Sequence, residues 1–221
     1  MIRNGYLQVT PAKQGKIDPE VALEGYRRGL FPMGSDRDDD IYAWFTHVPR
    51  GNLPLDQLHI SKSLKKELRR KTFEVTCDRA FENVISACAT GRDGDPSSAT
   101  WISKPIKQLF TDLHHMGHAH SIECWKEGEL VGGLYGLHIG GAFFGESMFS
   151  VESNASKIAL IYLVAHMRRQ GFSLLDTQQT TSHTKSMGVV DVHEIDYLWH
   201  LQTAVIQDVQ WGRFLPHIPE I

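Results

Sequence analysis

Residues 143–150 read Phe-Phe-Gly-Glu-Ser-Met-Phe-Ser, and residues 174–178 read Leu-Leu-Asp-Thr-Gln. Each run begins with apolar residues and ends in polar groups, and the segment from Asn154 to about Gln170 between them has the length of one helix. Two strands joined by a crossover helix bring their ends to one edge of a sheet, where α/β proteins tend to bind ligands. The first run supplies aromatic rings and a carboxylate, and the second supplies a carboxylate and an amide. This combination suggests an enzyme that holds an apolar acyl group and moves it.

Asp176 and Gln178 are the first candidates for chemistry. Side chains two residues apart on a strand point to the same face, so both should project from the end of their run together. A carboxylate beside a carboxamide can accept a proton and orient an amine. The alternative is that Asp176 caps a turn, as is common at strand ends, and that Gln178 is only exposed.

Glu146 is the next candidate. Strand alternation predicts that Phe144, Glu146 and Met148 share one face. The other face would then hold Phe143, Gly145, Ser147 and Phe149. A glutamate between aromatic residues either has a polar partner or lines a cleft. The alternative is a strand whose Glu146 faces solvent.

The composition is that of an ordinary globular chain. Its 221 residues allow one large domain or two small ones. No apolar run approaches the roughly 20 residues of a membrane span, and the first residues lack the apolar stretch of a signal peptide. The formal charge of -3 excludes a generally basic nucleic-acid binder but allows a local basic patch. Three cysteines without metal-ligand spacing indicate reduced thiols in a cytoplasmic protein.

Hydrophobic periodicity and capping residues predict the order of helices and strands. Asp18, Ser61 and Asp78 are expected to cap three of the helices. Residues 29–34 should form an apolar turn and residues 35–40 an acidic loop. The expected helices cover residues 19–28, 62–71, 79–89, 103–116 and 154–170, and the expected strands cover residues 41–45, 73–77, 119–125, 130–139, 142–149 and 173–177.

The second half of the chain resembles the core of GNAT-like acyltransferases in the order of its elements, which by itself says little about function. Members that use coenzyme A cradle its pyrophosphate in a glycine-rich loop before the helix. The corresponding residues here, 151–156, contain no glycine and include Glu152, which would repel a pyrophosphate. The sequence therefore argues against coenzyme A as the acyl donor.

Basic residues gather in the expected helix after Ser61, accompanied by one anion, Glu67. The cations are Lys62, Lys65, Lys66, Arg69, Arg70 and Lys71. Apolar residues recur every four positions on the opposite side of the helix, as in an amphipathic helix. The cationic side would fit a phosphate backbone, and the alternative is a solvated surface.

Four histidines lie between residues 114 and 120. His114 and His118 have the i, i+4 spacing that can bind zinc, but Gly117 should end the helix between them and no carboxylate or cysteine nearby completes a site. Partial positive charge at a helix C-terminus accounts better for these residues than a metal does.

With these residues in view, the chain resembles the leucyl/phenylalanyl-tRNA–protein transferases from about Ile17 to about Leu198. The matching segments are residues 26–33, 58–63, 100–102, 113–121, 128–136, 143–150, 154–157 and 176–178, with His183. So many ordered matches are more specific than any single motif. The resemblance implies an α+β fold, with a small N-terminal α/β domain (residues 1–60) and a GNAT-like acyltransferase domain with a mixed sheet (residues 61–221), the boundary falling between residues 55 and 98.

The resemblance also implies a function and a set of site residues. Members transfer leucine or phenylalanine from aminoacyl-tRNA to proteins that begin with Arg or Lys, which marks the product for degradation, and they use neither cofactor nor metal. Asp176 and Gln178 match the catalytic pair. The positions around the aminoacyl-adenosine are Met33, Trp101, Glu146, Leu134, Phe143 and Leu163, and those that bind tRNA are Lys62, Lys66, Arg69 and Arg70. We expect a monomer that does not associate with a membrane.

The resemblance leaves two conflicts. It places Phe143 at the aminoacyl side chain, whereas strand alternation places Phe144 beside Glu146, and a bulge near Gly145 could reconcile the two. The N-terminal part also departs from the family pattern, since the usual Trp-Trp-Ser-Pro is Trp-Phe-Thr-His at residues 44–47. The segment before Ile17 and the long insert at residues 91–98 differ as well.

The mechanistic hypothesis is that Gln178 orients the acceptor amine, while Asp176 fixes Gln178 and helps remove the proton. The apolar pocket would accept leucine, phenylalanine and methionine, since such pockets discriminate poorly between similar apolar groups. The sequence is also compatible with two other functions. One is a GNAT-like transferase that uses aminoacyl-tRNA but serves another acceptor, and the other is a tRNA-binding module without catalysis.

Overall fold

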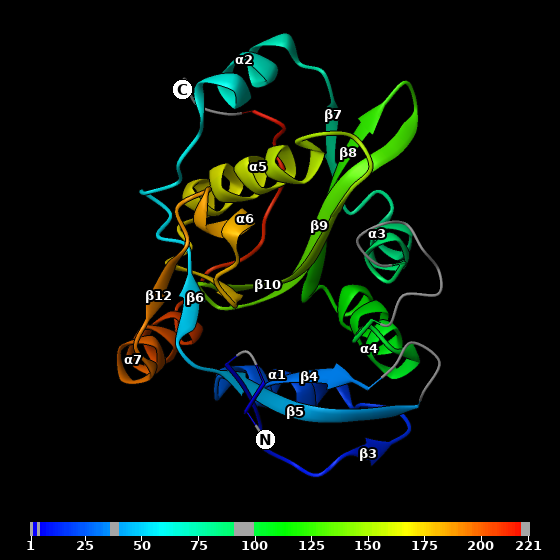
Figure 1. Cartoon of the computed structure of the whole chain (residues 1–221), viewed down its shortest axis with the longest axis vertical. Coiled ribbons are helices and arrows are strands. Elements are labelled where there is room, and N and C mark those ends of the chain that lie inside the picture. The colour runs from blue at the N-terminus through cyan, green and yellow to red at the C-terminus, as the bar shows by residue number, and fades with distance from the viewer. Residues whose placement is uncertain (1, 4, 36–39, 91–99, 218–221) are drawn as a thin grey trace.

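The computed structural model describes residues 2–3, 5–35, 40–90 and 100–217, which form two sheets and seven helices. The larger sheet has the strand order β12-β6-β11-β10-β9-β8-β7 (Figure 1). Its strands are β6 (Arg50–Asn52), β7 (Glu74–Cys77), β8 (Ala119–Lys126), β9 (Glu129–Ile139), β10 (Ala142–Ser150), β11 (Leu174–Gln178) and β12 (Val190–Val192). Only β10 and β11 run parallel among these neighbours, so the sheet is mixed.

The smaller sheet lies at the N-terminal end of the molecule. Its strands are β1 (Ile2–Arg3), β2 (Tyr6–Gln8), β3 (Lys13–Gln14), β4 (Phe31–Gly34) and β5 (Ile41–His47). The central strand β5 pairs with β2, β3 and β4, always antiparallel. The acidic loop expected between β4 and β5 falls mostly on residues outside the described part of the chain, as does the insert at residues 91–98.

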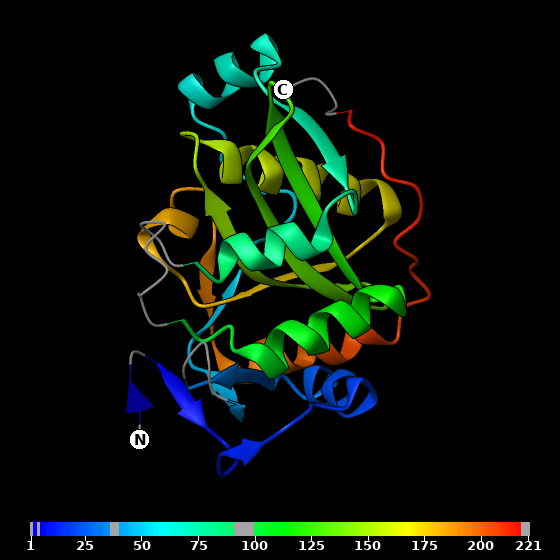
Figure 2. The same ribbon diagram turned by 90° about the vertical axis from the view of Figure 1, so that its right-hand side faces the viewer.

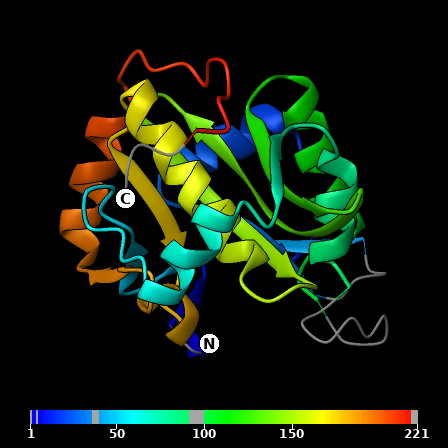
Figure 3. The same cartoon turned by 90° about the horizontal axis from the view of Figure 1, so that it is seen from above.

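Helices cover both faces of the larger sheet. They are α1 (Pro19–Arg27), α2 (Lys62–Arg70), α3 (Phe81–Cys88), α4 (Lys104–His115), α5 (Ala155–Gln170), α6 (Ser182–Lys185) and α7 (Glu194–Val205). Helix α5 packs against β8, β9 and β10 on one face, and Figure 3 shows it crossing that face. Helices α3, α4 and α7 lie on the other face, together with the smaller sheet (Figure 2).

Two apolar clusters follow from this layering. The cluster on the α5 face contains Leu134, Phe143 and Leu163, and the cluster on the opposite face contains Tyr26 and Phe144. Phe143 and Phe144 are adjacent in β10 and therefore point to opposite faces of the sheet. The α+β class and the mixed sheet expected from the sequence are confirmed.

Strand β10 contains the bulge that the sequence suggested. The pairing with β9 shifts between Gly145 and Ser147, so that Glu146 is the extra residue. The expected face of Phe144, Glu146 and Met148 is wrong for Met148, which packs into the α5-side cluster after the shift. Phe149 changes sides for the same reason and packs with the opposite cluster.

Several local expectations are wrong in instructive ways. Residues 31–34 form β4 and not a turn, because β5 pairs with them. Asp78 does not cap α3, which begins after Ala80. Instead Asp78 has a φ of 58° and accepts hydrogen bonds from the Ser121 backbone N–H and from His120. The sequence pattern did not predict β6, β12 or α7, although β6 and α7 hold parts of the site. None of the described helices is long and apolar enough to cross a membrane.

The division at residue 60 stays a prediction. Strand β6, which precedes that boundary, already belongs to the larger sheet.

Candidate active site

The polar ends of β10 and β11 lie where these two parallel strands part. Their pairing runs from Ala142 opposite Leu174 to Phe144 opposite Asp176 and then stops. Beyond it, the buried side chains of Glu146 and Gln178 meet between the two strands, with Gln178 Nε2 donating to Glu146 Oε1 at 2.8 Å. This gap between the backbones of β10 and β11 is called the opening below. The expected convergence of the two polar runs is therefore present in the structure.

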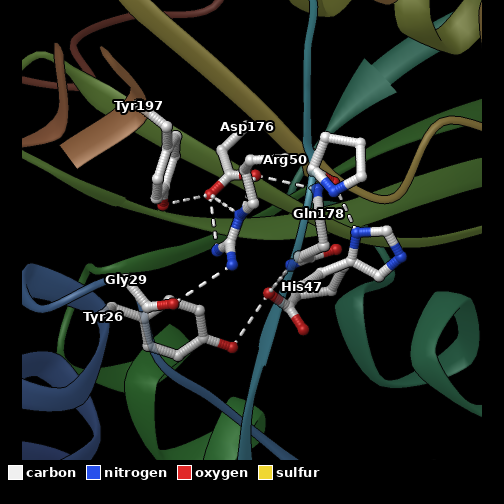
Figure 4. Close-up of polar contacts among 9 residues, drawn as sticks. Tyr26, Gly29, His47, Arg50, Asp176, Gln178 and Tyr197 are labelled. Carbon is white, nitrogen blue, oxygen red and sulfur yellow. Dashed lines mark hydrogen bonds and ion pairs between the residues drawn. The ribbon is translucent and has the colours of Figure 1, made fainter. Parts of the chain in front are cut away.

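Asp176 is fully buried and surrounded by donors (Figure 4). Arg50 Nε donates to Oδ1 at 3.0 Å and to Oδ2 at 3.1 Å, and Arg50 Nη2 donates to Oδ2 at 2.8 Å. The hydroxyl of Tyr197 donates to Oδ2 at 2.7 Å, and the backbone N–H of Gln178 donates to Oδ1 at 2.8 Å. These bonds make Asp176 an anchor for three segments of the chain, and they leave it poorly placed to receive a proton from a substrate.

Arg50 is equally enclosed, with 1% of its side chain exposed. Its Nη1 donates to the carbonyl oxygen of Gly29 at 3.1 Å, and its guanidinium lies over the rings of Phe31 and Tyr197 at 4.9 and 4.6 Å. A planar guanidinium suits this combination of a bidentate carboxylate contact and ring stacking. Arg50 thus ties the smaller sheet and α7 to β11.

Gln178 has an unusual backbone conformation for a residue with a side chain. Its φ of 52° lies in the left-handed region, and the pairing of β11 with β6 shifts between Asp176 and Gln178. Such conformations persist only where the surroundings impose them, and they concentrate at functional sites. The bond from Gln178 N–H to Asp176 is one such constraint. The carboxylate thus positions Gln178 through the backbone.

Glu146 is the titratable group between the two strands, and it is buried. Its Oε1 accepts hydrogen bonds from Gln178 Nε2 and from the hydroxyl of Tyr26, the latter at 2.9 Å. Burial raises the pKa of Glu146 to about 8. The bond from Tyr26 opposes this rise and the negative charge of Asp176 adds to it. Burial and then Glu146 raise the pKa of Tyr26 well above its usual value, so Tyr26 remains a donor.

The other residues expected around an aminoacyl-adenosine fall into two groups on either side of the sheet. Met33 and Trp101 lie together on the Tyr26 side, where the Gly34 N–H donates to the Trp101 carbonyl oxygen at 2.9 Å. Leu134, Phe143 and Leu163 form part of the α5-side cluster and are 3%, 0% and 1% exposed.

Phe143 and Glu146 therefore lie on different sides of β10, and strand alternation placed Phe144 beside Glu146 correctly. The Phe144 ring packs on Tyr26 with centroids 5.1 Å apart. Phe143 instead lies over β9 at Gly136, where a Cβ would come within 2.6 Å of its ring. The bulge at Glu146 changes which face the later residues take, but it does not bring Phe143 to Glu146.

The basic helix has the expected amphipathic form. Ser61 caps α2 by accepting from the Leu64 N–H, and Leu64 is 2% exposed. The side chains expected to bind tRNA are exposed, and they are Lys62, Lys66, Arg69 and Arg70. Glu67, the one anion of this helix, accepts from Asn154 Nδ2 at 2.8 Å at the start of α5. The cations on the outer side thus form a continuous positive surface.

Three residues of this site were not predicted from the sequence, namely Tyr26, Arg50 and Tyr197. Arg50 pairs with the carboxylate of Asp176, 126 positions along the chain, and Tyr26 donates to that of Glu146, 120 positions along. Hydrophobic periodicity reports only on nearby residues, so it predicts neither contact. The one local signal is an arginine in a turn-rich stretch with few other charges, residues 48–55.

Comparison with known proteins identifies the family of this chain. The family model described as leucyl/phenylalanyl-tRNA protein transferase matches residues 52–202, and the model of the N-terminal domain of the same family matches residues 15–46. The transferase of this name from Rhizorhabdus wittichii is 52% identical over 189 residues, which cover 86% of this chain and 75% of that protein. The one from Rhodospirillum rubrum is 48% identical over 208 residues, which cover 93% and 94%.

Solved structures are more distant. The L-PGS from Bacillus licheniformis matches 75% of this chain and 51% of its own chain at 16% identity, with a TM-score of 0.41. A likeness this low adds nothing to the assignment.

The carboxamide and the carboxylate that meet at the strand ends are the groups expected of an enzyme that transfers an acyl group to an amine. Sequence similarity to known transferases along most of the chain identifies the family within this class. The chain belongs to the leucyl/phenylalanyl-tRNA protein transferase family. It is accordingly an aminoacyltransferase that moves aminoacyl residues from tRNA to proteins.

Proposed function

We propose that this enzyme transfers leucine or phenylalanine, and methionine as a further donor residue, from charged tRNA to the N-terminal Arg or Lys of proteins. The product would carry a new apolar N-terminal residue that marks it for degradation. The observation that carries the proposal is the Gln178–Glu146 contact at the opening between β10 and β11, because it places a carboxamide and a titratable carboxylate where an ester and an amine can meet. We also propose that the enzyme works as a cytoplasmic monomer.

The donor would lie across the opening, with its two ends on different sides of the sheet. Met33 and Trp101 are near neighbours on the Tyr26 side and could hold the terminal adenosine. Leu134, Phe143 and Leu163 on the α5 side would receive the apolar side chain. Gly145 lies between these groups, and a Cβ there would have a single neighbour within 4 Å, the Asp176 carbonyl oxygen at 3.6 Å. A residue without a side chain lets a ligand approach the backbone closely.

The chemistry needs one proton acceptor and good alignment. The acceptor α-ammonium, with a pKa near 8, loses a proton, its nitrogen forms a bond to the ester carbonyl carbon, and the bond to the 3′ oxygen breaks. As the amide forms, the nitrogen loses its second proton, which reaches the leaving 3′ oxygen through the neighbouring ribose hydroxyl, since that hydroxyl gives up one proton and takes up the other. Alignment of amine and ester accounts for much of the acceleration in such a reaction.

Glu146 is the residue best suited to accept the amine proton. Its pKa of about 8 is close to that of an α-ammonium, so proton transfer from the amine to the ionised form of Glu146, the minor form at neutral pH, is nearly balanced in free energy. Gln178 would orient the amine through its carboxamide. We assign Asp176 a positioning role, through Arg50 and the Gln178 backbone, in place of the proton transfer that the sequence suggested.

Helix α2 would bind the tRNA backbone. Four exposed cations on one helix can contact successive phosphates, which gives an affinity that falls steeply with salt. Such contacts position the tRNA without reading its sequence, so the choice of amino acid would rest on the apolar pocket.

Incubation of the enzyme with leucyl-tRNA and labelled peptides tests the proposal. We expect leucine on peptides that begin with Arg or Lys, and none on an N-acetylated Arg peptide or on a matched peptide that begins with Ala. Turnover with a different acceptor would instead support a transferase with another substrate. Binding of charged tRNA without product would contradict catalysis altogether.

A further inference from the structure

A hollow lined in part by Asn52, the strand partner of Asp176, lies outside the site described above. It has a volume of about 570 Å³, within the range of small-molecule sites. Its walls come from the segment after β6, from the end of α5 and the residues that follow it, and from α7. Figure 1 shows α7 beside β12 and β6, at the side of the molecule away from α3 and α4. None of the residues assigned above to the donor or the acceptor lines this hollow.

An exposed indole forms one wall. Trp199 in α7 is 66% exposed, although large aromatic side chains are usually buried. Its neighbour Tyr197 points the other way, to Asp176, so that α7 presents one ring to the anchor and one to the hollow. An exposed aromatic face is a stacking surface for a planar ring, and stacking of a nucleic-acid base on such a face is sequence-tolerant.

Positive charge and hydrogen-bonding groups complete the lining. Arg168, exposed in the last turn of α5, and His200 in α7 both line the hollow, and Asp56 is the one carboxylate in the lining. Within the described ranges Arg168 forms no ion pair, which leaves its guanidinium available. A guanidinium recognises phosphate oxygens in a bidentate manner.

Asn52 supplies the most specific feature. It lines the hollow, it is 9% exposed, and its Oδ1 is a buried atom without a hydrogen-bond partner among the residues that the structure describes. A buried polar atom without a partner costs free energy, so a ligand that donates to it gains the corresponding stabilisation. A carboxamide has a donor and an acceptor side by side, which matches the edge of a nucleobase such as adenine.

We infer that this hollow, between Trp199, Arg168 and Asn52, is a nucleotide-binding site that is separate from the aminoacyl-transfer site. The base stacks on Trp199 and bonds Asn52 through its edge, and Arg168 with His200 receives the phosphate. Both a free mononucleotide and a single unpaired nucleotide of an RNA have this chemistry. Asn52 is also the strand partner of Asp176, so the ligand would contact the same strand that carries Arg50.

Calorimetric titration of the full chain with adenosine 5′-monophosphate, and separately with a single-stranded oligoadenylate six nucleotides long, tests the inference. We expect Trp199→Ala to weaken binding about tenfold, in line with the stacking of one base, and Arg168→Glu to weaken it further. Arg213→Glu is the matched control for charge, because Arg213 is exposed and does not line the hollow, and it should bind as the wild type does. Circular dichroism would show that the variants are folded.

Trp101→Ala separates this site from the adenosine position proposed for the donor. Binding that survives in Trp101→Ala but weakens in Trp199→Ala supports the inference whether or not the transfer assay succeeds. Equal affinity for the two probes indicates a free nucleotide, whereas a clear preference for the oligomer indicates RNA. The inference is overturned if neither probe binds, if Trp199→Ala and Arg168→Glu both bind as the wild type, or if only Trp101→Ala loses binding.

Discussion

Replacement of Arg50 by methionine isolates the ion pair that holds the candidate active site together. Arg50 donates three hydrogen bonds to Asp176 over 2.8–3.1 Å, and a fourth to the Gly29 carbonyl oxygen. Both partners of the pair are almost fully enclosed, at 1% and 0% exposure. Methionine fills a similar apolar volume but leaves the Asp176 carboxylate buried without its cation.

The expected loss is large. Removal of one partner of a buried ion pair costs about 3–5 kcal/mol of unfolding free energy, because the remaining charge is uncompensated. For a chain of this size, that loss lowers the melting temperature by roughly 6–20 °C. Urea denaturation followed by circular dichroism measures it directly.

Arg28→Met provides the matched control. Arg28 pairs with Glu24 at 2.7 Å, but the two side chains are 70% and 50% exposed. An exposed pair one helical turn apart is worth about 0.3–0.5 kcal/mol, so this variant should unfold nearly as the wild type does. In a double-mutant cycle with Asp176→Asn, we expect the Arg50 and Asp176 changes to couple by about 1–3 kcal/mol. A loss below about 1 kcal/mol in Arg50→Met, similar to that in Arg28→Met, would refute the anchor.

Three other predictions concern the opening, the basic helix and the apolar pocket. The pKa of Glu146 is raised to about 8, above its unfolded value of about 4.3, so the stability that its proton contributes is present in full below about pH 4, falls progressively between about pH 4.3 and pH 8, and is lost above pH 8. Urea unfolding at several pH values should therefore show stability falling by up to ~1 kcal/mol per pH unit relative to Glu146→Gln, and parallel curves would contradict the raised pKa. Charge reversal of Lys66 and Arg70 should weaken binding of charged tRNA and lower the salt dependence by about one phosphate contact each, whereas unchanged filter binding would remove α2 from the interface. Leu163→Ala should cost about 2–5 kcal/mol of stability and, in a competition assay, favour phenylalanine over leucine; an unchanged ratio would place the pocket elsewhere.

The sequence predicted the part of the fold that depends on the local pattern of apolar and polar residues. The strands over residues 119–150, the helix α5 and the return strand β11 all lie within one or two residues of their expected ends. Their apolar periodicity is regular, and the parallel pairing of β10 with β11 follows from a strand, helix and strand in succession.

The features that the sequence did not predict depend on contacts between residues that lie far apart in the chain. The anchor joins β6, β11 and α7, which lie more than 120 positions apart at their extremes, and two of these three elements were not predicted at all. Residues 31–34 have the composition of a turn and become a strand only because β5 lies alongside. The role that we propose for Asp176 differs from the expected one for the same reason, since the sequence alone does not show that Arg50 pairs with this carboxylate.

Because of the bulge at Glu146, strand alternation predicts which face of the sheet the earlier residues of β10 occupy, but not which face the later ones occupy. Alternation placed Phe144 and Glu146 together correctly, and it failed two residues later at Met148. A bulge reverses the parity of every residue that follows it, and no composition rule locates that reversal within β10.

The single-turnover rate of leucine transfer to an Arg-initiated peptide tests the central claim most directly, when Gln178→Ala is compared with Gln179→Ala. Gln178 donates to Glu146 across the opening, whereas the half-buried Gln179 accepts from the Tyr6 hydroxyl at 3.3 Å. Misalignment of the reacting groups costs on the order of 100-fold in rate. We predict a loss of about that size in Gln178→Ala with the fold intact, and a rate within a few-fold of the wild type in Gln179→Ala. Transfer by Gln178→Ala at the wild-type rate would contradict the account.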